Sequence, residues 1–200
     1  MGSAHAAPED EAKNGPPVFT VGHSTRSTEE LVALLQAAAV DELVDVRRYP
    51  ASRRHPHFNR GPLEEALNVA GIGYRHVEIL GGRRGAPAEG SPNTAWRSAS
   101  FQAYADHLAT EPARHALDGL EADARSRRLC LLCAEKLPWR CHRQLLADVL
   151  SLRGLSVRHL LEPDRELPHT PHSSAALSPD GTVIYPADAA SQGDLFEEGE

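Results

Sequence analysis

Short apolar runs alternate with helical patterns from residue 17 to residue 161, and this alternation limits the fold more than any other feature of the chain. Strands that alternate with helices form a parallel sheet, because each helix carries the chain back across a face of the sheet. The sequence therefore predicts a three-layer α/β domain with a mostly parallel, Rossmann-like sheet of about five strands. The expected strands comprise residues 17–21, 43–46, 74–80, 129–134 and 156–161.

Capping and breaker residues mark the expected helices. Ser27 and Glu30 have the spacing of a capping box, which opens a helix. Gly61-Pro62 opens a second helix, and Gly71 ends it. Further helical patterns cover residues 98–109, 112–127 and 140–152.

The two ends of the chain differ in composition from its middle. Residues 162–200 are rich in proline and carry nine acidic residues against one arginine, within a net charge of −7 for the whole chain. We expect a disordered N-terminal tail over 1–16, the α/β domain over 17–161, and a mostly disordered acidic tail over 162–200. The alternative for part of that tail is a small hairpin around residues 179–181.

Composition also bears on the compartment. No apolar run approaches the roughly 20 residues that span a bilayer, and the first residues lack the apolar region of a secretory signal. Three unevenly placed cysteines do not make a disulfide framework. We therefore expect a cytoplasmic protein with no membrane partner.

Three motifs lie where expected strands end. They are Gly22-His23-Ser24, Asp45-Val46-Arg47, and Cys133-Ala134-Glu135 with the following Cys141-His142-Arg143. Parallel strands bring their carboxyl ends to one edge of the sheet, where ligands of such folds bind. Motifs far apart in the sequence are therefore expected to form one site.

Arginines concentrate in and beyond the second motif. Residues 45–84 hold eight arginines and no lysine, and the planar guanidinium fork suits phosphate or carboxylate. One interpretation is an anion-binding site, and the other is a solvated arginine-rich loop. The candidate anion-binding residues are Gly22, Ser24, Arg47, Arg53, Arg140, His142 and Arg143.

Proton chemistry has candidates in the same motifs. His23 could act as a general acid or base, or it could only satisfy backbone groups in the turn. Asp45 and Glu135 could form a carboxylate pair, or each could form an ion pair with Arg47 or Arg143. Both alternatives stay open at the level of sequence.

The cysteines separate into one core residue and two candidate catalytic residues. Cys130 and Cys133 are an odd number of positions apart on a strand, so they point to opposite faces and we expect Cys130 in the core. Cys133 follows at the strand end, and Cys141 lies at a helix start between arginines, where a thiol pKa falls. The spacing from Cys133 to Arg140 loosely resembles the anion loop of cysteine phosphatases, with one residue more. No HExxH or finger-like spacing occurs, so no metal site is predicted.

One short segment lies near the C-terminus. Residues 192–196, Gln-Gly-Asp-Leu-Phe, resemble the pentapeptide by which bacterial repair and replication proteins dock on the β sliding clamp, with Gly193 in place of the usual leucine. Gln192, Leu195 and Phe196 are the expected contacts, since apolar anchors on a flexible tail suit a partner groove.

A set of ordered motifs carries a family resemblance. They are TVGHS at 20–24, DVRRYPASRR at 45–54, GIGY at 71–74, LGGRRG at 80–85, LLCAE at 131–135 and CHR at 141–143. Over residues 18–161 the chain resembles the domain-of-unknown-function family 488. The resemblance implies an α/β fold and membership of an uncharacterised bacterial and archaeal group that is sometimes encoded beside DNA-repair genes.

Three functional hypotheses follow. The leading one is a nucleic-acid-associated protein of DNA repair or processing, with a phosphate- or nucleotide-binding site at the strand ends. The second is a small-molecule enzyme that uses a reactive cysteine on an oxyanion or thiol substrate. The third is a non-catalytic ligand-binding module. The sequence indicates no particular cofactor.

Overall fold

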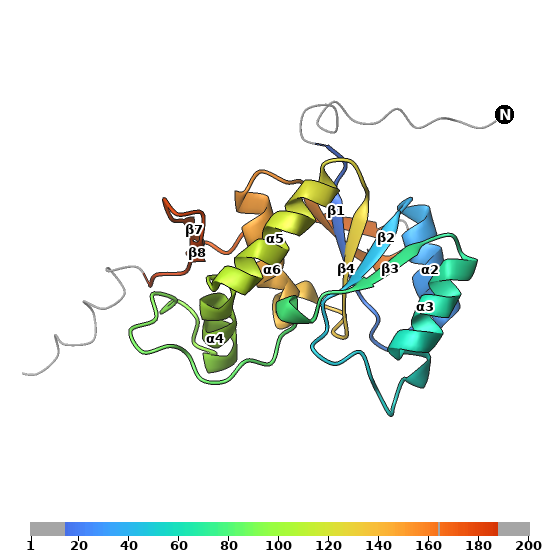
Figure 1. Ribbon diagram of the computed structural model, residues 1–200, viewed down its shortest axis with the longest axis horizontal. Helices are drawn as coiled ribbons and strands as arrows, with labels where there is room; N and C mark the ends of the chain where they lie inside the picture. Colours follow the sequence, from blue (N-terminus) through green and yellow to red (C-terminus); the bar gives the residue numbers. More distant parts are fainter. Residues whose placement is uncertain (1–14, 164, 188–200) are drawn as a thin grey trace, which may run out of the picture.

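The computed structural model describes residues 15–163 and 165–187, and a six-stranded sheet forms their centre (Figure 1). The strand order is β3-β2-β4-β1-β5-β6, and every neighbouring pair is parallel except β5 and β6. The strands are β1 (Val18–Gly22), β2 (Glu42–Asp45), β3 (Gly73–His76), β4 (Leu129–Cys133), β5 (Val157–Glu162) and β6 (Arg165–Pro168). The expected α/β fold with a mostly parallel sheet is confirmed.

Helices cover both faces of this sheet (Figure 1). They are α2 (Thr28–Ala37), α3 (Arg60–Val69), α4 (Ala99–Leu108), α5 (Glu111–Ala124) and α6 (Arg143–Leu152). The buried leucines of α2 and α3 pack on one face, and those of α5 and α6 pack on the other. The sheet therefore separates two apolar cores, which makes the three layers.

The central strand β4 shows how the sequence divides between these cores. Side chains on a strand point alternately to opposite faces. Cys130 and Leu132 belong to the core under α2 and α3, whereas Leu129 and Leu131 belong to the other core. Cys130 is fully buried, as expected from the sequence.

Some element boundaries differ from the expected ones. The capping box of Ser27 and Glu30 forms, but the third strand ends at His76, and a short 3₁₀-helix η2 (Glu78–Leu80) replaces its last residues. The final helix begins at Arg143 rather than near Arg140, because the 3₁₀-helix η3 (Pro138–Arg140) occupies the preceding turn. These 3₁₀ turns contribute side chains and carbonyls to the loops at the strand ends.

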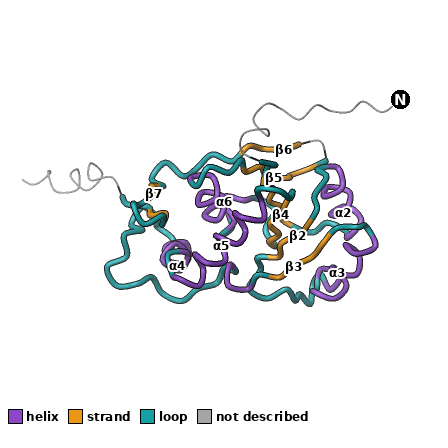
Figure 2. The backbone as a smooth tube through the Cα atoms, turned by 45° about the horizontal axis from the view of Figure 1, so that its top comes forward, coloured by secondary structure: helices purple, strands orange, loops and turns teal. Residues whose placement is uncertain are grey.

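The chain beyond residue 161 contributes to the fold as far as it is described. β6 extends the sheet beside β5 (Figure 2). β7 (Ala176–Leu177) pairs with β8 (Val183–Ile184), which is the hairpin around residues 179–181 given as the alternative to a disordered segment. Tyr185 is buried in the core next to α6. The ordered domain therefore reaches beyond the predicted boundary at 161, because strands of two to four residues leave little periodicity in a sequence. None of the described helices is long and apolar enough to cross a membrane.

Candidate functional site

A cavity of about 670 Å³ opens at the carboxyl edge of the sheet. The loops after β1, β2 and β4 form its floor, and they are joined by backbone hydrogen bonds that continue the strand ladders. The amides of His23 and Ser24 donate to the carbonyls of Cys133 and Ala134 at 2.9 and 2.8 Å. The amide of Val46 donates to the carbonyl of Leu132 at 3.1 Å. The three motifs of the sequence thus meet at one site.

The predicted site residues divide into those that line the cavity and those that lie beneath it. The residues that line it are His23, Ser24, Arg47, Cys133, Glu135, Arg140, Cys141 and His142. Gly22, Asp45 and Arg143 are buried below its surface. Arg53 is exposed but does not line the cavity.

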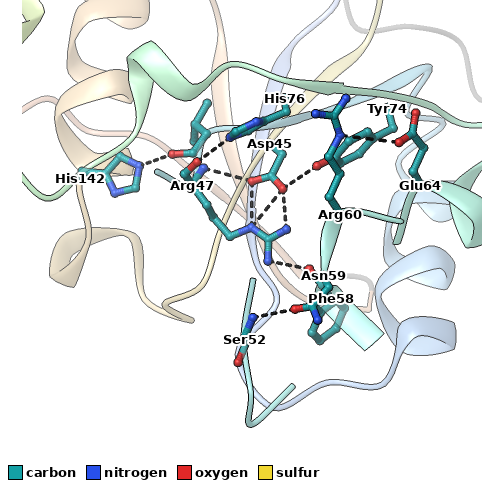
Figure 3. Close-up of polar contacts among 11 residues, drawn as sticks. Asp45, Arg47, Ser52, Phe58, Asn59, Arg60, Glu64, Tyr74, His76 and His142 are labelled. Carbon is teal, nitrogen blue, oxygen red and sulfur yellow. Dashed lines mark hydrogen bonds and ion pairs between the residues drawn. The ribbon is translucent and has the colours of Figure 1, made fainter. Parts of the chain in front are cut away.

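Arg47 lines the cavity, but its guanidinium group is bound to Asp45 (Figure 3). Nη2 of Arg47 lies 2.5 Å from Oδ2 of Asp45, Nε donates to Oδ1 at 2.8 Å, and both side chains are almost fully buried. Nη1 donates to the carbonyl of Phe58 at 2.9 Å, and the hydroxyl of Tyr74 donates to Asp45 at 2.9 Å. The pair therefore fastens the loop after β2 to the sheet, which favours the ion-pair alternative for Asp45 over the carboxylate pair.

Arg143 is also a structural residue. Its Nη2 donates to the carbonyls of Glu135 and Lys136, and its Nη1 donates to the Thr20 hydroxyl at 3.0 Å. Because the guanidinium contacts the backbone of Glu135 and not its carboxylate, it does not form the alternative ion pair expected from the sequence. A Cβ atom on Gly22 would lie 1.8 Å from the same Glu135 carbonyl oxygen, so only glycine fits at this strand end.

A buried chain of hydrogen bonds continues from Thr20 towards the C-terminal segment. The Thr20 hydroxyl lies 2.8 Å from Nδ1 of His159, and Nε2 of His159 lies 3.1 Å from Nδ1 of His169. Nε2 of His169 lies 2.8 Å from Oδ1 of Asp148, and the Tyr185 hydroxyl donates to the same carboxylate. The segment after β6 is thereby joined to the base of the site through polar contacts.

His23 packs against an aromatic ring in the wall of the cavity. Its ring centroid lies 4.3 Å from that of Phe58, and burial together with the charge of Arg47 lowers the His23 pKa to about 4. His23 is therefore neutral at pH 7. A neutral imidazole can accept a proton or donate a hydrogen bond, but it does not hold the extra proton that a general acid needs.

Two thiols and an imidazole converge on the cavity floor. Nδ1 of His142 lies 3.6 Å from Sγ of Cys133 and 3.7 Å from Sγ of Cys141. The hydrogen bond to Cys141, together with burial, raises the pKa of the Cys133 thiol. Burial opposes ionisation of Cys141, but the hydrogen bond from Cys133 and the charge of Arg143 lower its pKa well below the ordinary value. The negative charge of this pair therefore belongs on Cys141.

Four arginines of the cavity have no carboxylate partner within the described residues. They are Arg48, Arg54, Arg83 and Arg140. Glu135 is the single carboxylate among the described residues that line the cavity. Of these four, only Arg140 was predicted from the sequence to bind an anion. Each of the other three is adjacent to a second arginine, and no sequence pattern shows which member of such a pair lines the cavity.

The predicted clamp-binding residues Gln192, Leu195 and Phe196 lie outside the described part of the chain.

Comparison with known proteins gives one family. The model of the domain of unknown function DUF488 matches residues 27–150, more than half of the chain. This match includes the second and third motifs of the site, whereas the Gly22-His23-Ser24 motif precedes it. No curated protein and no solved structure shows a significant match.

Proposed function

The chain belongs to the DUF488 family of domains of unknown function, and we propose that its cavity binds a phosphate-bearing ligand, a nucleotide either free or within a nucleic acid. The observation that carries this proposal is a group of four arginines around one cavity that have no carboxylate partner among the described residues. They are defined as the rim arginines: Arg48, Arg54, Arg83 and Arg140.

The charge of the cavity favours an anion. Burying or crowding cations without counter-charges is unfavourable, and a phosphate accepts bidentate hydrogen bonds from a guanidinium. Arg47 is already neutralised by Asp45, so the rim arginines set the local charge, with Glu135 alone opposing them. An anionic ligand would complete these contacts.

The size and the wall chemistry of the cavity favour a nucleotide over a bare inorganic ion. A volume of about 670 Å³ lies within the range of sites for cofactor-sized molecules. Tyr49 lines the cavity with 62% of its surface exposed, and Phe101 also lines it. An exposed aromatic ring next to cationic side chains, as at Tyr49, provides a stacking surface for a base.

The test is a binding titration of the full chain with AMP and with a short single-stranded oligonucleotide across a salt series. We expect the double variant Arg83→Ala/Arg140→Ala to bind at least about 10-fold more weakly and to show a smaller salt dependence, since each lost phosphate contact lowers the slope by roughly 0.7. Arg125→Ala is the matched control. Arg125 is an exposed arginine that follows α5 just before β4, at the amino edge of the sheet, and among the described residues its ion-pair partner is Glu121.

The two ligands separate the two sources of phosphate. If the protein binds AMP but not the oligonucleotide, the ligand is a free nucleotide. If it binds the oligonucleotide more tightly than AMP, the ligand is a nucleic acid. Equal affinity of the double variant and the wild type, or absence of binding at low salt, would refute the proposal and favour the other hypotheses: a cysteine-dependent enzyme for a different small molecule, or another binding module.

Two finer hypotheses extend beyond the cavity. A role in DNA repair or processing would follow from preference for a damaged or single-stranded substrate. Docking on a sliding clamp through residues 192–196 would bring the cavity to DNA. Deletion of these five residues is expected to abolish clamp binding and to leave nucleotide binding unchanged.

A further inference from the structure

We propose that Cys133, Cys141 and His142 bind a zinc ion whose fourth coordination position opens into the cavity. The ligand atoms of these three residues all lie within 4.8 Å of one another. Each of the three residues also lines the cavity.

The distances between the ligand atoms suit a tetrahedral ion. Zinc lies about 2.3 Å from a thiolate sulfur and about 2.0–2.1 Å from an imidazole nitrogen, so a tetrahedral angle separates sulfur from nitrogen by about 3.6 Å. The two sulfur atoms lie 3.6 and 3.7 Å from Nδ1 of His142. Little movement of the side chains is therefore needed to receive the ion.

The hydrogen bonding of His142 leaves the correct nitrogen free. Nε2 lies 2.9 Å from the carbonyl oxygen of Val46 (Figure 3), and a carbonyl can only accept, so Nε2 carries the proton. In the neutral ring Nδ1 then presents a lone pair, which points to the two sulfur atoms. A backbone carbonyl that fixes the outer nitrogen is the usual second contact of a metal-binding histidine.

A metal-free arrangement explains less of this geometry. Without an ion, Nδ1 has no hydrogen to donate to either sulfur and the Cys133 thiol donates to Cys141, so nothing holds both sulfur atoms at nearly the same distance from Nδ1. A shared cation accounts for both contacts. The amide of Arg143 also donates to Sγ of Cys141 at 3.5 Å, an interaction that stabilises a thiolate ligand.

The ligand types favour zinc over the hard cations magnesium and calcium. Thiolate and imidazole ligands disfavour magnesium and calcium, which take oxygen ligands. Two thiolates balance the charge of Zn²⁺, so the rim arginines keep their attraction for an anion. Three protein ligands with an open fourth position are typical of catalytic rather than structural zinc. Such an ion polarises a bound water or substrate oxygen.

This inference rests on the proposed function only for the identity of the substrate that would bind at the ion. The three protein ligands of the ion are argued independently of that proposal. The two can therefore fail separately. Zinc binding without AMP or oligonucleotide binding would refute the proposed function only. Binding of AMP or the oligonucleotide without zinc binding would refute the metal site only.

The experiment uses the full chain after treatment with a chelator. It is reloaded with Zn²⁺ for stoichiometry and with Co²⁺ for spectroscopy. We expect one ion per chain, visible Co²⁺ bands of tetrahedral intensity and a thiolate charge-transfer band. Cys133→Ser, Cys141→Ser and His142→Gln are expected to weaken Zn²⁺ binding by at least about 100-fold, beyond the 10–100-fold cost of losing an outer contact.

Two further variants control for folding. Cys130→Ala removes a thiol from the opposite core and should leave stoichiometry and spectrum unchanged. Gly82→Ala keeps every ligand but brings a Cβ to within 2.9 Å of Nδ1 of His142, so it should weaken binding in a protein with an unchanged circular dichroism spectrum. Zinc uptake well below one per chain, an octahedral Co²⁺ spectrum, or affinity unaffected by Cys133→Ser and Cys141→Ser would overturn the inference.

Discussion

Replacement of Asp45 by alanine tests whether the second motif supports the fold or contacts the ligand. The carboxylate of Asp45 is fully buried and receives hydrogen bonds from Arg47 and Tyr74. Asp45→Ala leaves the guanidinium of Arg47 buried without a counter-charge. The expected consequence is a large loss of stability that arises from the stranded charge, not from a missing contact with substrate.

The magnitude follows from burial. Breaking a buried ion pair by removing one partner costs about 3–5 kcal/mol, a large part of the roughly 5–15 kcal/mol by which a domain is stable. With a urea slope of about 2 kcal/mol per molar, the unfolding midpoint should fall by about 1.5–2.5 M. Tyr74 is half-buried, so its released hydroxyl can bind water and should add little.

The assay is urea unfolding followed by circular dichroism, with AMP titration of the folded variant. A double variant, Asp45→Leu/Arg47→Met, removes both charges together and should recover most of the loss, because replacement of a buried pair by apolar side chains is often close to neutral. If Asp45→Ala lowers stability by less than about 1 kcal/mol, or if the double variant is no better than the single one, the structural role assigned to the pair is wrong.

Two other predictions concern the base of the site. Gly22→Ala should lower the free energy of unfolding by about 3 kcal/mol or more, because the added Cβ would overlap the carbonyl of Glu135. Gly61→Ala, with nothing within 4 Å of the added atom, should be neutral or stabilising in the same thermal unfolding experiment. Equal melting temperatures of the two variants would contradict this prediction. Burial and neighbouring His169 lower the pKa of His159 from 6.5 to about 3. Between these two pH values the unfolded chain binds a proton at His159 that the folded chain does not bind, so the free energy of unfolding is unaffected by this group above about pH 6.5 and decreases as the pH falls towards 3. His159→Gln should therefore show a smaller decrease in urea midpoint between pH 7 and pH 4.5 than the wild type, and an unchanged decrease would refute the shift.

The sequence predicted the sheet well because its signals are local. Apolar runs, the Ser27–Glu30 capping box and helix stripes each lie within one element, and alternation alone implies parallel strands. It did not predict β6 or the burial of Tyr185, since these depend on contacts with α6 and β5 that have no local pattern. The same topology explains why the place of the site was predictable: strand ends meet whatever their separation in the chain.

The roles of individual residues were less predictable. Arg47 and Arg143 were both expected to bind an anion. In the structure the guanidinium group of Arg47 is bound to Asp45, and that of Arg143 donates to loop carbonyls. Whether an arginine is paired is a property of three-dimensional neighbours. The converging ligands at the floor were also hidden, because Cys133 ends β4 whereas Cys141 and His142 follow η3, at a spacing that matches no metal motif.

The arginine pairs show how one short motif serves both scaffold and cavity. In each of 47–48, 53–54 and 83–84, the two arginines have different surroundings. Arg47 is bound to Asp45, whereas its neighbour Arg48, which lines the same cavity, has no ion pair with any described residue. Arg84 donates to the carbonyl of Ile79 at 2.6 Å while Arg83 is exposed at the cavity.

This division affects how binding data must be interpreted. A variant of Arg47 or Arg143 disturbs the loops that carry the cavity, so it can weaken ligand binding without any lost ligand contact. A variant of a rim arginine such as Arg83 removes an exposed side chain and leaves those loops in place. Loss of binding therefore identifies a phosphate contact only where unfolding stability is unchanged. By that criterion the informative positions of the three pairs are Arg48, Arg54 and Arg83.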